Sequence, residues 1–311
     1  MDDEPNSLEQ KLPRGVVKVL QRFMEQGFWN KWAKATEVQL REPAQQFDPE
    51  FMRKLVPKME TFTSYFGAEV RGMDRVPQSP VLLIGNHSGG LITPDTSAVY
   101  AAWYRTRGFD DPLMGLAFDG IYAVPVWREL MRKIGQMPAN MDNARAALGD
   151  GCSVLLYPGG AYEVFRPWKD RNRITFKDRK GFIRLALQAA VPVVPVVGHG
   201  GHETTIVLTR GERLAKLLSL DKVRMDGAPL LFQVPWGVSS PAMPGVPLPA
   251  KITVQVCEPL DWSRFGPEGA DDPEVLERCY EEITSVMQTA LDTLAIENPR
   301  PLLSRFIRRK G

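Results

Sequence analysis

The sequence predicts an α/β protein in which helices flank a mixed sheet. Short apolar runs bounded by turn-forming residues alternate along the chain with segments of helical periodicity. The content of 43% hydrophobic and 24% charged residues is typical of a globular protein. Because neither a repeat nor a break in composition divides the 311 residues, we expect one domain over residues 48–298. An amphipathic helical arm over 1–47 would precede it, and a basic, apolar tail over 299–311 would follow.

The predicted arm combines apolar and basic residues at helical spacing. Its apolar positions recur at intervals of three and four, and they are Val16, Val17, Leu20, Phe23, Met24, Phe28, Trp29 and Trp32. Lysines and arginines lie between them, and residues 302–310 repeat this combination. Such a helix either lies on an anionic membrane surface or packs its apolar face on the protein's own core. Peripheral attachment to the inner face of a membrane is therefore one of two expectations.

The first half of the domain is expected to begin with a helix that runs from Asp48 to residue 66. Aspartate is a good N-cap, and Pro49 suits the first helical position. Residues 81–84 read as a buried strand that Gly85 and Asn86 end. The other expected elements are strands over 68–72 and 113–117 and helices over 96–105 and 124–134.

The second half continues the alternation of helices and strands. We expect helices over 141–148, 181–190, 210–220 and 272–297, and strands over 152–157 and 251–257. Residues 191–197 form an apolar β segment interrupted by two prolines, which are unusual in a central strand. Residues 230–249 are apolar and rich in proline, so we expect a wall or lid rather than regular structure there.

His87 lies where the strand over 81–84 would emerge, and Gly89, Gly90, Pro94 and Asp95 follow it. Open α/β sheets place their chemistry at the carboxyl ends of strands. A histidine there can act as a general base, since its ordinary pKa of about 6.5 lies near working pH. Asp95 could then fix the tautomer of the ring. The alternative is a capped loop in which Asp95 is an N-cap and His87 a surface residue.

A second informative turn follows the strand over 152–157. Its residues Pro158, Gly159 and Gly160 let the backbone approach a ligand, although a sharp turn would also need the glycines. Glu163 lies within one turn of the strand end. Residues 166–180 then carry seven lysines and arginines. They are either a solvated loop or a landing site for the phosphates of coenzyme A or a lipid headgroup.

Several classes of protein are disfavoured. The net charge of +2 gives no support for nucleic-acid binding. Three cysteines without a C-x-x-C pattern, and no apolar run typical of a signal peptide or a spanning helix, suggest a reduced, cytoplasmic protein. His199 and His202 lack an evident third metal ligand, so we expect no metal site. We expect the pair to border the pocket that holds the substrate.

Four segments resemble the motifs of the glycerolipid (lysophospholipid) acyltransferases, in the family's order over residues 45–262. Asn86-His87 followed by Asp95 resembles the first, although the usual H-x-x-x-x-D spacing would put the acid at Ile92. Residues 132–138 resemble the second motif. Residues 158–163 resemble the third in its P-G-G-x-x-E form, which is typical of relatives that esterify neutral alcohols such as diacylglycerol. Residues 191–197 resemble the fourth, V-P-V-x-P-V.

The resemblance implies a glycerol-phosphate acyltransferase-like fold and direct acyl transfer from acyl-CoA or acyl carrier protein to a hydroxyl of a lipid alcohol. No metal or redox cofactor is needed. His87 would be the general base, and Asp95, or otherwise Glu163, would orient its ring. The implied substrate-binding residues are Asn86, Ser88, Gly89, Gly90, Pro158, Gly159, Gly160, Glu163, Arg166 and Lys180. Backbone N–H groups near Gly159 and Gly160 are candidate oxyanion donors.

Rival functions remain at this point. Ser88 lacks the G-x-S-x-G context of a serine hydrolase, and no G-x-G-x-x-G follows the first strand as in a dinucleotide enzyme. A non-catalytic lipid-binding protein on the same fold is harder to exclude, as is an enzyme that acylates glycerol 3-phosphate or lysophosphatidate. Against these last acceptors, Ala161 and Tyr162 stand where the family's phosphate-binding Arg is expected.

Overall fold

The computed structural model describes residues 46–304, apart from 79, 88, 91, 119–120, 123, 213–226, 242 and 244. The predicted arm up to residue 45, the tail beyond residue 304, Ser88 and most of the helix predicted over 210–220 therefore lie outside the described residues.

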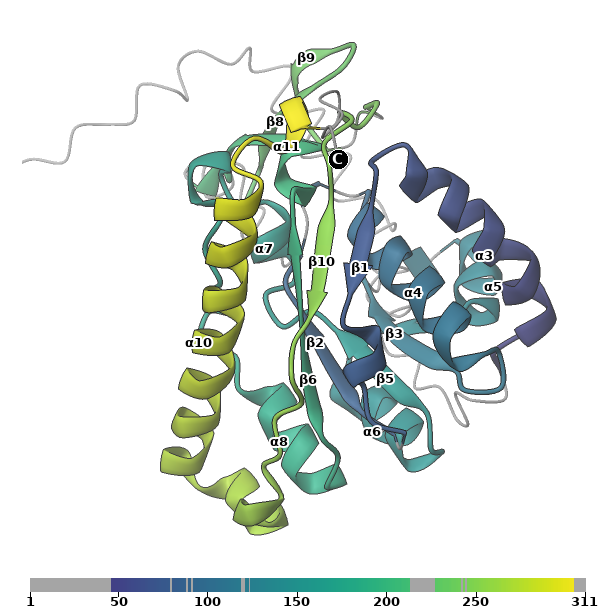
Figure 1. Cartoon of the computed structure of the whole chain (residues 1–311), viewed down its shortest axis with the longest axis vertical. Coiled ribbons are helices and arrows are strands. Elements are labelled where there is room, and N and C mark those ends of the chain that lie inside the picture. Colours follow the sequence, from purple (N-terminus) through teal and green to yellow (C-terminus); the bar gives the residue numbers. More distant parts are fainter. Residues whose placement is uncertain are drawn as a thin grey trace, which may run out of the picture.

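A seven-stranded mixed sheet forms the centre of the domain (Figure 1). Its order is β1 (Glu69–Arg71), β10 (Thr253–Val256), β6 (Val193–His199), β2 (Leu82–Gly85), β5 (Ser153–Leu156), β3 (Leu113–Ala117) and β4 (Gln136–Pro138). The strands from β6 to β4 are parallel to one another, whereas β10 pairs with β6 in the antiparallel sense and with β1 in the parallel sense. The predicted α/β class with a mixed sheet is confirmed.

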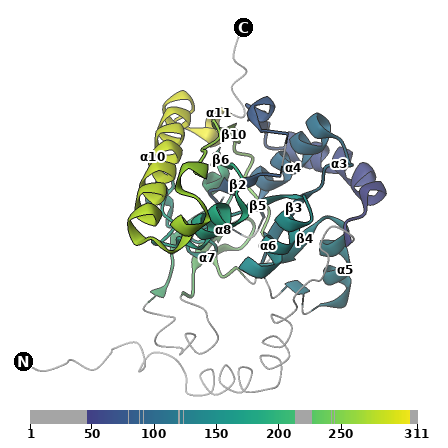
Figure 2. The same ribbon diagram turned by 90° about the horizontal axis from the view of Figure 1, so that it is seen from below.

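Helices cover both faces of this sheet (Figure 2). The described helices are α3 (Pro49–Ser64), α4 (Pro94–Arg107), α5 (Pro125–Lys133), α6 (Met141–Gly149), α7 (Ala161–Val164), α8 (Gly181–Ala189), α10 (Pro273–Glu297) and α11 (Pro301–Ser304). Short 3₁₀ turns join them at η2 (Met73–Arg75), η4 (Trp168–Asp170), η5 (Gly201–Glu203), η7 (Ser263–Phe265) and η8 (Pro267–Asp271).

Alternation along the strands divides the core into two layers. Leu82 and Ile84 point to the face covered by α6, α8 and α10, and Leu83 points to the face covered by α3 and α4. All four residues of β2 are buried, as expected for a parallel strand with helices on both sides. The functional loops can therefore emerge only at the ends of the strands.

Capping aspartates fix the two helix starts that the sequence predicted. Asp48 accepts a hydrogen bond from the backbone N–H of Phe51 at 2.9 Å, and Asp272 accepts one from Glu274 at 2.8 Å. Helix α4 differs, because its N-cap is Thr93 and Asp95 is the second residue of the helix. The alternative in which Asp95 is an N-cap is thus wrong.

The strand β6 keeps Pro195 near the centre of the sheet. Its carbonyl accepts the backbone N–H of Cys257 at 2.9 Å, one residue beyond the end of β10. The N–H that proline lacks therefore falls where the partner strand has already ended. Because Pro192 lies before the strand begins, a run with two prolines can still serve as a central strand.

A second, three-stranded antiparallel sheet contains β7 (Ile206–Thr209), β8 (Leu230–Gln233) and β9 (Gly237–Ser239). The expectation of an irregular wall over residues 230–249 is therefore wrong for β8 and β9. The prolines of that segment lie outside both strands, so they do not interrupt the ladder. Within the described part of the chain, no helix has the length and apolar character needed to cross a membrane.

Candidate active site

Three neighbouring parallel strands end at the same edge of the large sheet and bring the predicted site together. In the order β6, β2, β5, Gly85 lies opposite Val196 and Ile84 lies opposite Leu156. The loops after β2, β5 and β6 carry His87, Pro158 and His202 respectively. Their proximity follows from strand order, as in other open α/β sheets.

The ring of His87 stacks on the ring of Tyr157, with centroids 4.3 Å apart and planes 23° apart. The hydroxyl of Tyr157 shares a 2.8 Å hydrogen bond with Oγ1 of Thr96, in the first turn of α4. A Cβ on Gly85 would lie 2.3 Å from a Tyr157 ring carbon, so glycine is required for this close approach. Sequence reasoning gave Tyr157 and Thr96 no role in the site, although Tyr157 directly precedes Pro158.

Glu163 is fully buried and holds the backbone of His87 rather than its ring. Its Oε2 accepts the His87 backbone N–H at 3.2 Å, and its Oε1 accepts a bond from Nη2 of Arg166 at 2.8 Å. Burial raises the pKa of Glu163 to about 7, while the charge of Arg166 opposes that rise. Arg166 is also buried, and its Nε and Nη1 have no hydrogen-bond partner among the described residues.

The bonds described for the two acids proposed to orient His87 go to backbone groups and to Arg166. Oδ1 of Asp95 accepts the backbone N–H of Thr96 at 2.8 Å, and a Cβ on Gly198 would lie 3.2 Å from Oδ2 of Asp95. Nδ1 of His87 is buried without a hydrogen-bond partner in the described part of the chain. The orienting role of Asp95 therefore stays a prediction, since catalytic hydrogen bonds often tighten only when substrate binds.

Asn86 fastens the start of the His87 loop to β6. Its Nδ2 donates to the carbonyl of Gly198 at 2.9 Å, and its Oδ1 accepts the Gly198 N–H at 2.8 Å. Both ends of the amide are thus used within the protein, which favours a positioning role over the predicted substrate contact.

The glycines of the loop pack against the segment that follows β6. A Cβ on Gly89 would lie 2.8 Å from Nδ1 of His202, and one on Gly90 would lie 2.9 Å from Thr205. Gly90 also has φ of +80°, a conformation that favours glycine. The two glycines let the His87 loop and the His202 loop approach closely.

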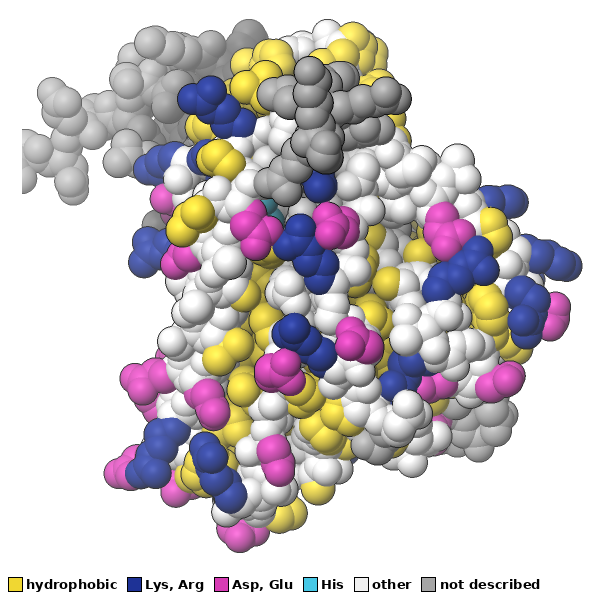
Figure 3. All heavy atoms as spheres, viewed as in Figure 1, with side chains coloured by type: hydrophobic (Ala, Val, Ile, Leu, Met, Phe, Trp, Pro, Cys, Tyr) yellow, Lys and Arg dark blue, Asp and Glu magenta, His cyan; other side chains and the backbone are white. Residues whose placement is uncertain are grey.

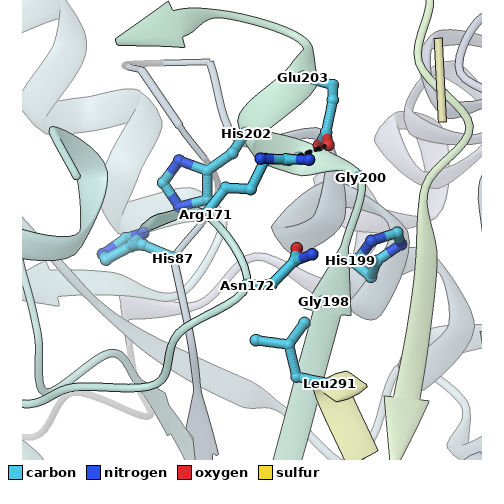
Figure 4. Close-up of a pocket in the computed structure, with 10 residues that line it drawn as sticks. His87, Arg171, Asn172, Gly198, His199, Gly200, His202, Glu203 and Leu291 are labelled. Atoms are coloured by element: carbon cyan, nitrogen blue, oxygen red, sulfur yellow. Dashed lines mark hydrogen bonds and ion pairs between the residues drawn. The ribbon is translucent and has the colours of Figure 1, made fainter. Parts of the chain in front are cut away.

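All three histidines of the chain line one small pocket (Figure 4). The ring of His202 lies toward His87, and His199 lies beyond Asn172. About 10 Å³ is open to the centre of a water molecule, roughly the room that one water needs. The described residues contain no group of three or more metal-ligating side chains suited to hold an ion.

Burial keeps these histidines neutral. It lowers the pKa of His87 to about 3 and that of His199 to about 4, with the charges of Arg166 and Arg171 adding to the respective effects. Burial likewise lowers the pKa of His202 well below its ordinary value, and Arg166 adds to this. A neutral imidazole at position 87 is the form that can accept a proton.

Arg171 and Glu203 also line the pocket. Nε of Arg171 donates to Oε1 of Glu203 at 2.9 Å, and its guanidinium lies 3.8 Å above the ring of Trp168. In the sequence, Arg171 stands out only as a member of the basic run, and no pattern predicts its ion pair with Glu203.

Several backbone groups of the glycine turn after β5 form hydrogen bonds within the protein. The N–H of Gly160 donates to the carbonyl of Tyr157 at 3.1 Å, so it is already occupied and does not support the predicted oxyanion role. Nη1 of Arg179 donates to the carbonyls of Pro158 and Gly159 at 2.9 and 3.2 Å. A Cβ on Gly159 would meet Cγ of Glu163 at 2.0 Å, so this glycine makes room for the buried acid.

Part of the basic run is engaged in structural contacts, Lys169, Arg173 and Lys177 are exposed, and the role as a landing site for phosphates stays a prediction. Arg166, Arg171 and Arg179 make the bonds given above, and Lys180 pairs with Glu277 of α10 at 2.6 Å and with Asp178 at 2.9 Å. Arg166 therefore lies at the site, whereas Lys180 forms an ion pair with α10.

Comparisons with known proteins support the resemblance to the acyltransferases. Residues 44–276 match the family model described as diacylglycerol acyltransferase. An uncharacterized protein of Mycobacterium tuberculosis is 28% identical over 247 residues, which cover 79% of this chain and 67% of that protein. Diacylglycerol O-acyltransferase 2 of Danio rerio is 30% identical over 153 residues, or 45% of this chain and 40% of the fish protein.

A solved structure also resembles the chain. The crystal structure of the 1-acyl-sn-glycerophosphate acyltransferase PlsC from Thermotoga maritima is 14% identical, with 90% of this chain and 95% of that chain covered. The TM-score is 0.47, a similarity too low to decide either fold or function.

Proposed function

The chain belongs to the diacylglycerol acyltransferase family, and we propose from this premise that it transfers an acyl group from acyl-CoA or acyl carrier protein to the hydroxyl of a neutral lipid alcohol. One observation carries the proposal within the family. A neutral His87 emerges at the end of a central strand, stacked on Tyr157 and held through its backbone by the buried Glu163.

The proposed reaction needs one base and no resident cofactor. His87 takes the proton of the acceptor hydroxyl as the oxygen attacks the thioester carbonyl. The tetrahedral intermediate then expels the thiolate, and the imidazolium returns the proton to it, which leaves an ester and a free thiol. The substrate thus supplies the nucleophile that a serine supplies in serine proteases.

Arg166 is our candidate for stabilising the developing oxyanion. It is buried, and its Nε and Nη1 donors have no partner among the described residues, while Nη2 is held by Glu163. In a site of low polarity, fixed donors of this kind act strongly on a charge that appears only in the transition state. The same oxyanion would offset the effect of Arg166 on the pKa of His87, because it would favour the imidazolium.

The proposed acceptor is uncharged or zwitterionic. A phosphorylated acceptor would bring a negative charge that needs an arginine partner. Ala161 and Tyr162 provide none, and Arg171, Arg179 and Lys180 are engaged elsewhere. The two open donors of Arg166 serve the oxyanion in this proposal, so they are not available to a phosphate as well. Desolvating an unpaired phosphate costs several kcal/mol, on the order of what separates a good substrate from a poor one.

A non-catalytic lipid-binding protein is the second candidate. The observation that favours it is the absence of a hydrogen bond from the described residues to Nδ1 of His87, together with the loop that is three residues longer than the family pattern. Peripheral attachment through the arm and tail is compatible with either function and stays a prediction.

His87→Ala tests the proposal. With radiolabelled acyl-CoA, diacylglycerol and a long-chain alcohol should be acylated with higher kcat/KM than glycerol 3-phosphate or lysophosphatidate. The His87→Ala variant should lose about 10²–10⁴-fold in kcat, because it lacks the general base. Asp95→Asn should lose less if the lengthened loop leaves the pair imperfectly aligned.

Thermal unfolding of each variant serves as the control for folding. Near-wild-type turnover in folded His87→Ala protein would refute the base. Preference for a phosphorylated acceptor would refute the acceptor class alone, and acyl-CoA binding without transfer to any acceptor would favour the lipid-binding candidate.

A further inference from the structure

The small sheet presents apolar side chains on both of its faces. Val207, Leu231 and Ser239 lie in one cross-strand row and are buried against the domain. Ile206, Phe232 and Val238 form the neighbouring row on the other face. An antiparallel sheet with one face on a core normally turns polar residues outward, so a second apolar face needs an explanation.

This outer surface is extensive. We call it the β7–β9 surface, and its exposed apolar residues are Leu208, Phe232, Val234, Trp236, Val238, Met243 and Val246. Val238 and Val246 are 63% and 58% exposed, more than most apolar residues that the structure describes. Hydrophobic side chains gather there over β9, at the top of the molecule in Figure 3.

The composition of this stretch indicates what covers it. Residues 227–250 contain no Asp, Glu, Lys, Arg or His in 24 positions, whereas the chain average of 24% charged residues would give about six. A protein partner leaves a polar, solvated rim around an apolar centre. A lipid layer, by contrast, penalises any charge that enters it and accommodates exposed aromatic and aliphatic residues.

A second exposed apolar group, on α5, lacks this property. Val126 is 78% exposed and Trp127 is 52% exposed, but Arg128 and Glu129 follow them directly. Residues 227–250, which carry all of the β7–β9 surface except Leu208, therefore stand apart by their lack of charge rather than by exposure alone.

The small sheet adjoins the candidate active site. Strand β7 starts one residue after Thr205, the residue that a Cβ on Gly90 would touch. The N–H of Leu248, beyond Val246, donates to the carbonyl of Thr204 at 2.8 Å. A lipid layer in contact with this sheet would lie next to the loop that carries His87.

We propose that the β7–β9 surface inserts its exposed apolar side chains into the interface of a lipid membrane and so delivers the His87 loop to lipid substrates. The proposal rests on the proposed function, because only an enzyme with lipid substrates needs such delivery. The place of attachment follows from the uncharged, exposed sheet. It assigns to the sheet an attachment that depends on apolar contact and not on lipid charge.

Single Val→Glu substitutions test the surface. The full chain is co-sedimented with vesicles of phosphatidylcholine at high salt, where attraction between charges is screened. Val238→Glu and Val246→Glu should each weaken binding about tenfold or more, because a carboxylate resists transfer into lipid. Val126→Glu on α5 is the matched control, since it adds the same charge at a more exposed valine and should leave binding unchanged.

Three results would overturn the proposal: wild-type binding in both sheet variants, equal losses in all three variants, or a wild-type dimer that the sheet variants disperse without loss of vesicle binding. The last would make a second copy of the chain the occupant. Melting temperatures show whether each variant is folded. Val246→Glu tests the same surface independently if Val238→Glu proves to be unfolded. Transfer to a detergent-dispersed short-chain acceptor should persist in the sheet variants, so loss of docking is separable from failure of the proposed chemistry.

Discussion

At the scale of single residues, the position of the His87 ring depends on a glycine that touches it only indirectly. Gly85 leaves the space in which Tyr157 lies, Tyr157 stacks on His87, and Thr96 fixes the Tyr157 hydroxyl. A general base has to hold its nitrogen within hydrogen-bond reach of the reacting proton. The activity therefore depends on the absence of a side chain at position 85.

Gly85→Ala should lower kcat by about 10–10² with a smaller change in KM, because a displacement of about 1 Å in a catalytic group has effects of this size. The new Cβ would lie 2.3 Å from the Tyr157 ring, which must move and take its stacking contact with it. Steady-state kinetics on the neutral acceptor measures the effect. Gly149→Ala is the matched control, since a Cβ there meets nothing within 4 Å. Equal kcat in both variants would show that the stack does not position His87.

The sequence revealed the site residues that belong to motifs. The structure added residues that belong to the site only because they lie close to it in space. His87, Glu163 and Arg166 follow from local patterns, and they do lie close together. Tyr157 and the Arg171–Glu203 pair could not be found in this way. Their contacts depend on the order β6, β2, β5, which is a long-range pairing that no local pattern encodes.

At the scale of elements, the end of α8 shows how a boundary is fixed. The predicted helix over 181–190 ends one residue earlier, and Ala190 becomes its C-cap in the left-handed conformation, with φ of +51°. Glycine is the usual residue there, since a Cβ is strained at positive φ. The alanine at this position is therefore a local weakness of the fold.

Ala190→Gly should stabilise the protein by about 0.5–1 kcal/mol, because relief of the left-handed strain exceeds the extra entropy of the unfolded chain. Ala189→Gly, one residue earlier and still helical, should destabilise it by about 1 kcal/mol. Urea unfolding of both variants measures the difference. Destabilisation of similar size in both would mean that Ala190 is not strained.

Element types could be predicted more fully than their boundaries. Parallel strands buried on both faces, such as β2 and β5, gave short apolar runs that the sequence shows directly. The strands β8 and β9 were not predicted, because their neighbouring prolines dominate the composition of residues 230–249. The pairing of β8 with β7 joins segments separated by 20 intervening residues and has no local signature.

At the scale of the whole molecule, the histidines of the site couple stability to pH. The folded-state pKa values of His87 and His199 are lowered to about 3 and about 4, against about 6.5 in an unfolded chain. Their contribution to stability is present above pH 6.5 and is lost as pH falls, since only the unfolded chain takes up the protons. Glu163 opposes this, because its raised pKa of about 7 makes its contribution fall as pH rises from about 4.5 to 7.

His199→Gln isolates one of these contributions. Between pH 4 and 6.5 the free energy of unfolding should depend on pH less steeply than in the wild type, by about 1.4 kcal/mol per pH unit, the effect of one proton. Urea unfolding at a series of pH values measures the slope. Above pH 7 the two proteins should have parallel profiles, which is the internal control. Parallel profiles below pH 6.5 as well would show that His199 titrates normally.

The two hydrogen bonds between Asn86 and Gly198 have a consequence for how the protein is made. They join residues that are 112 positions apart, while Glu163 and the His87 backbone are 76 apart. At about 5–20 residues per second, a ribosome needs roughly 6–22 s to add the stretch between Asn86 and Gly198. During that interval the nascent His87 loop has no β6 to hold it, and the base reaches its place only after the second half of the sheet has been synthesised.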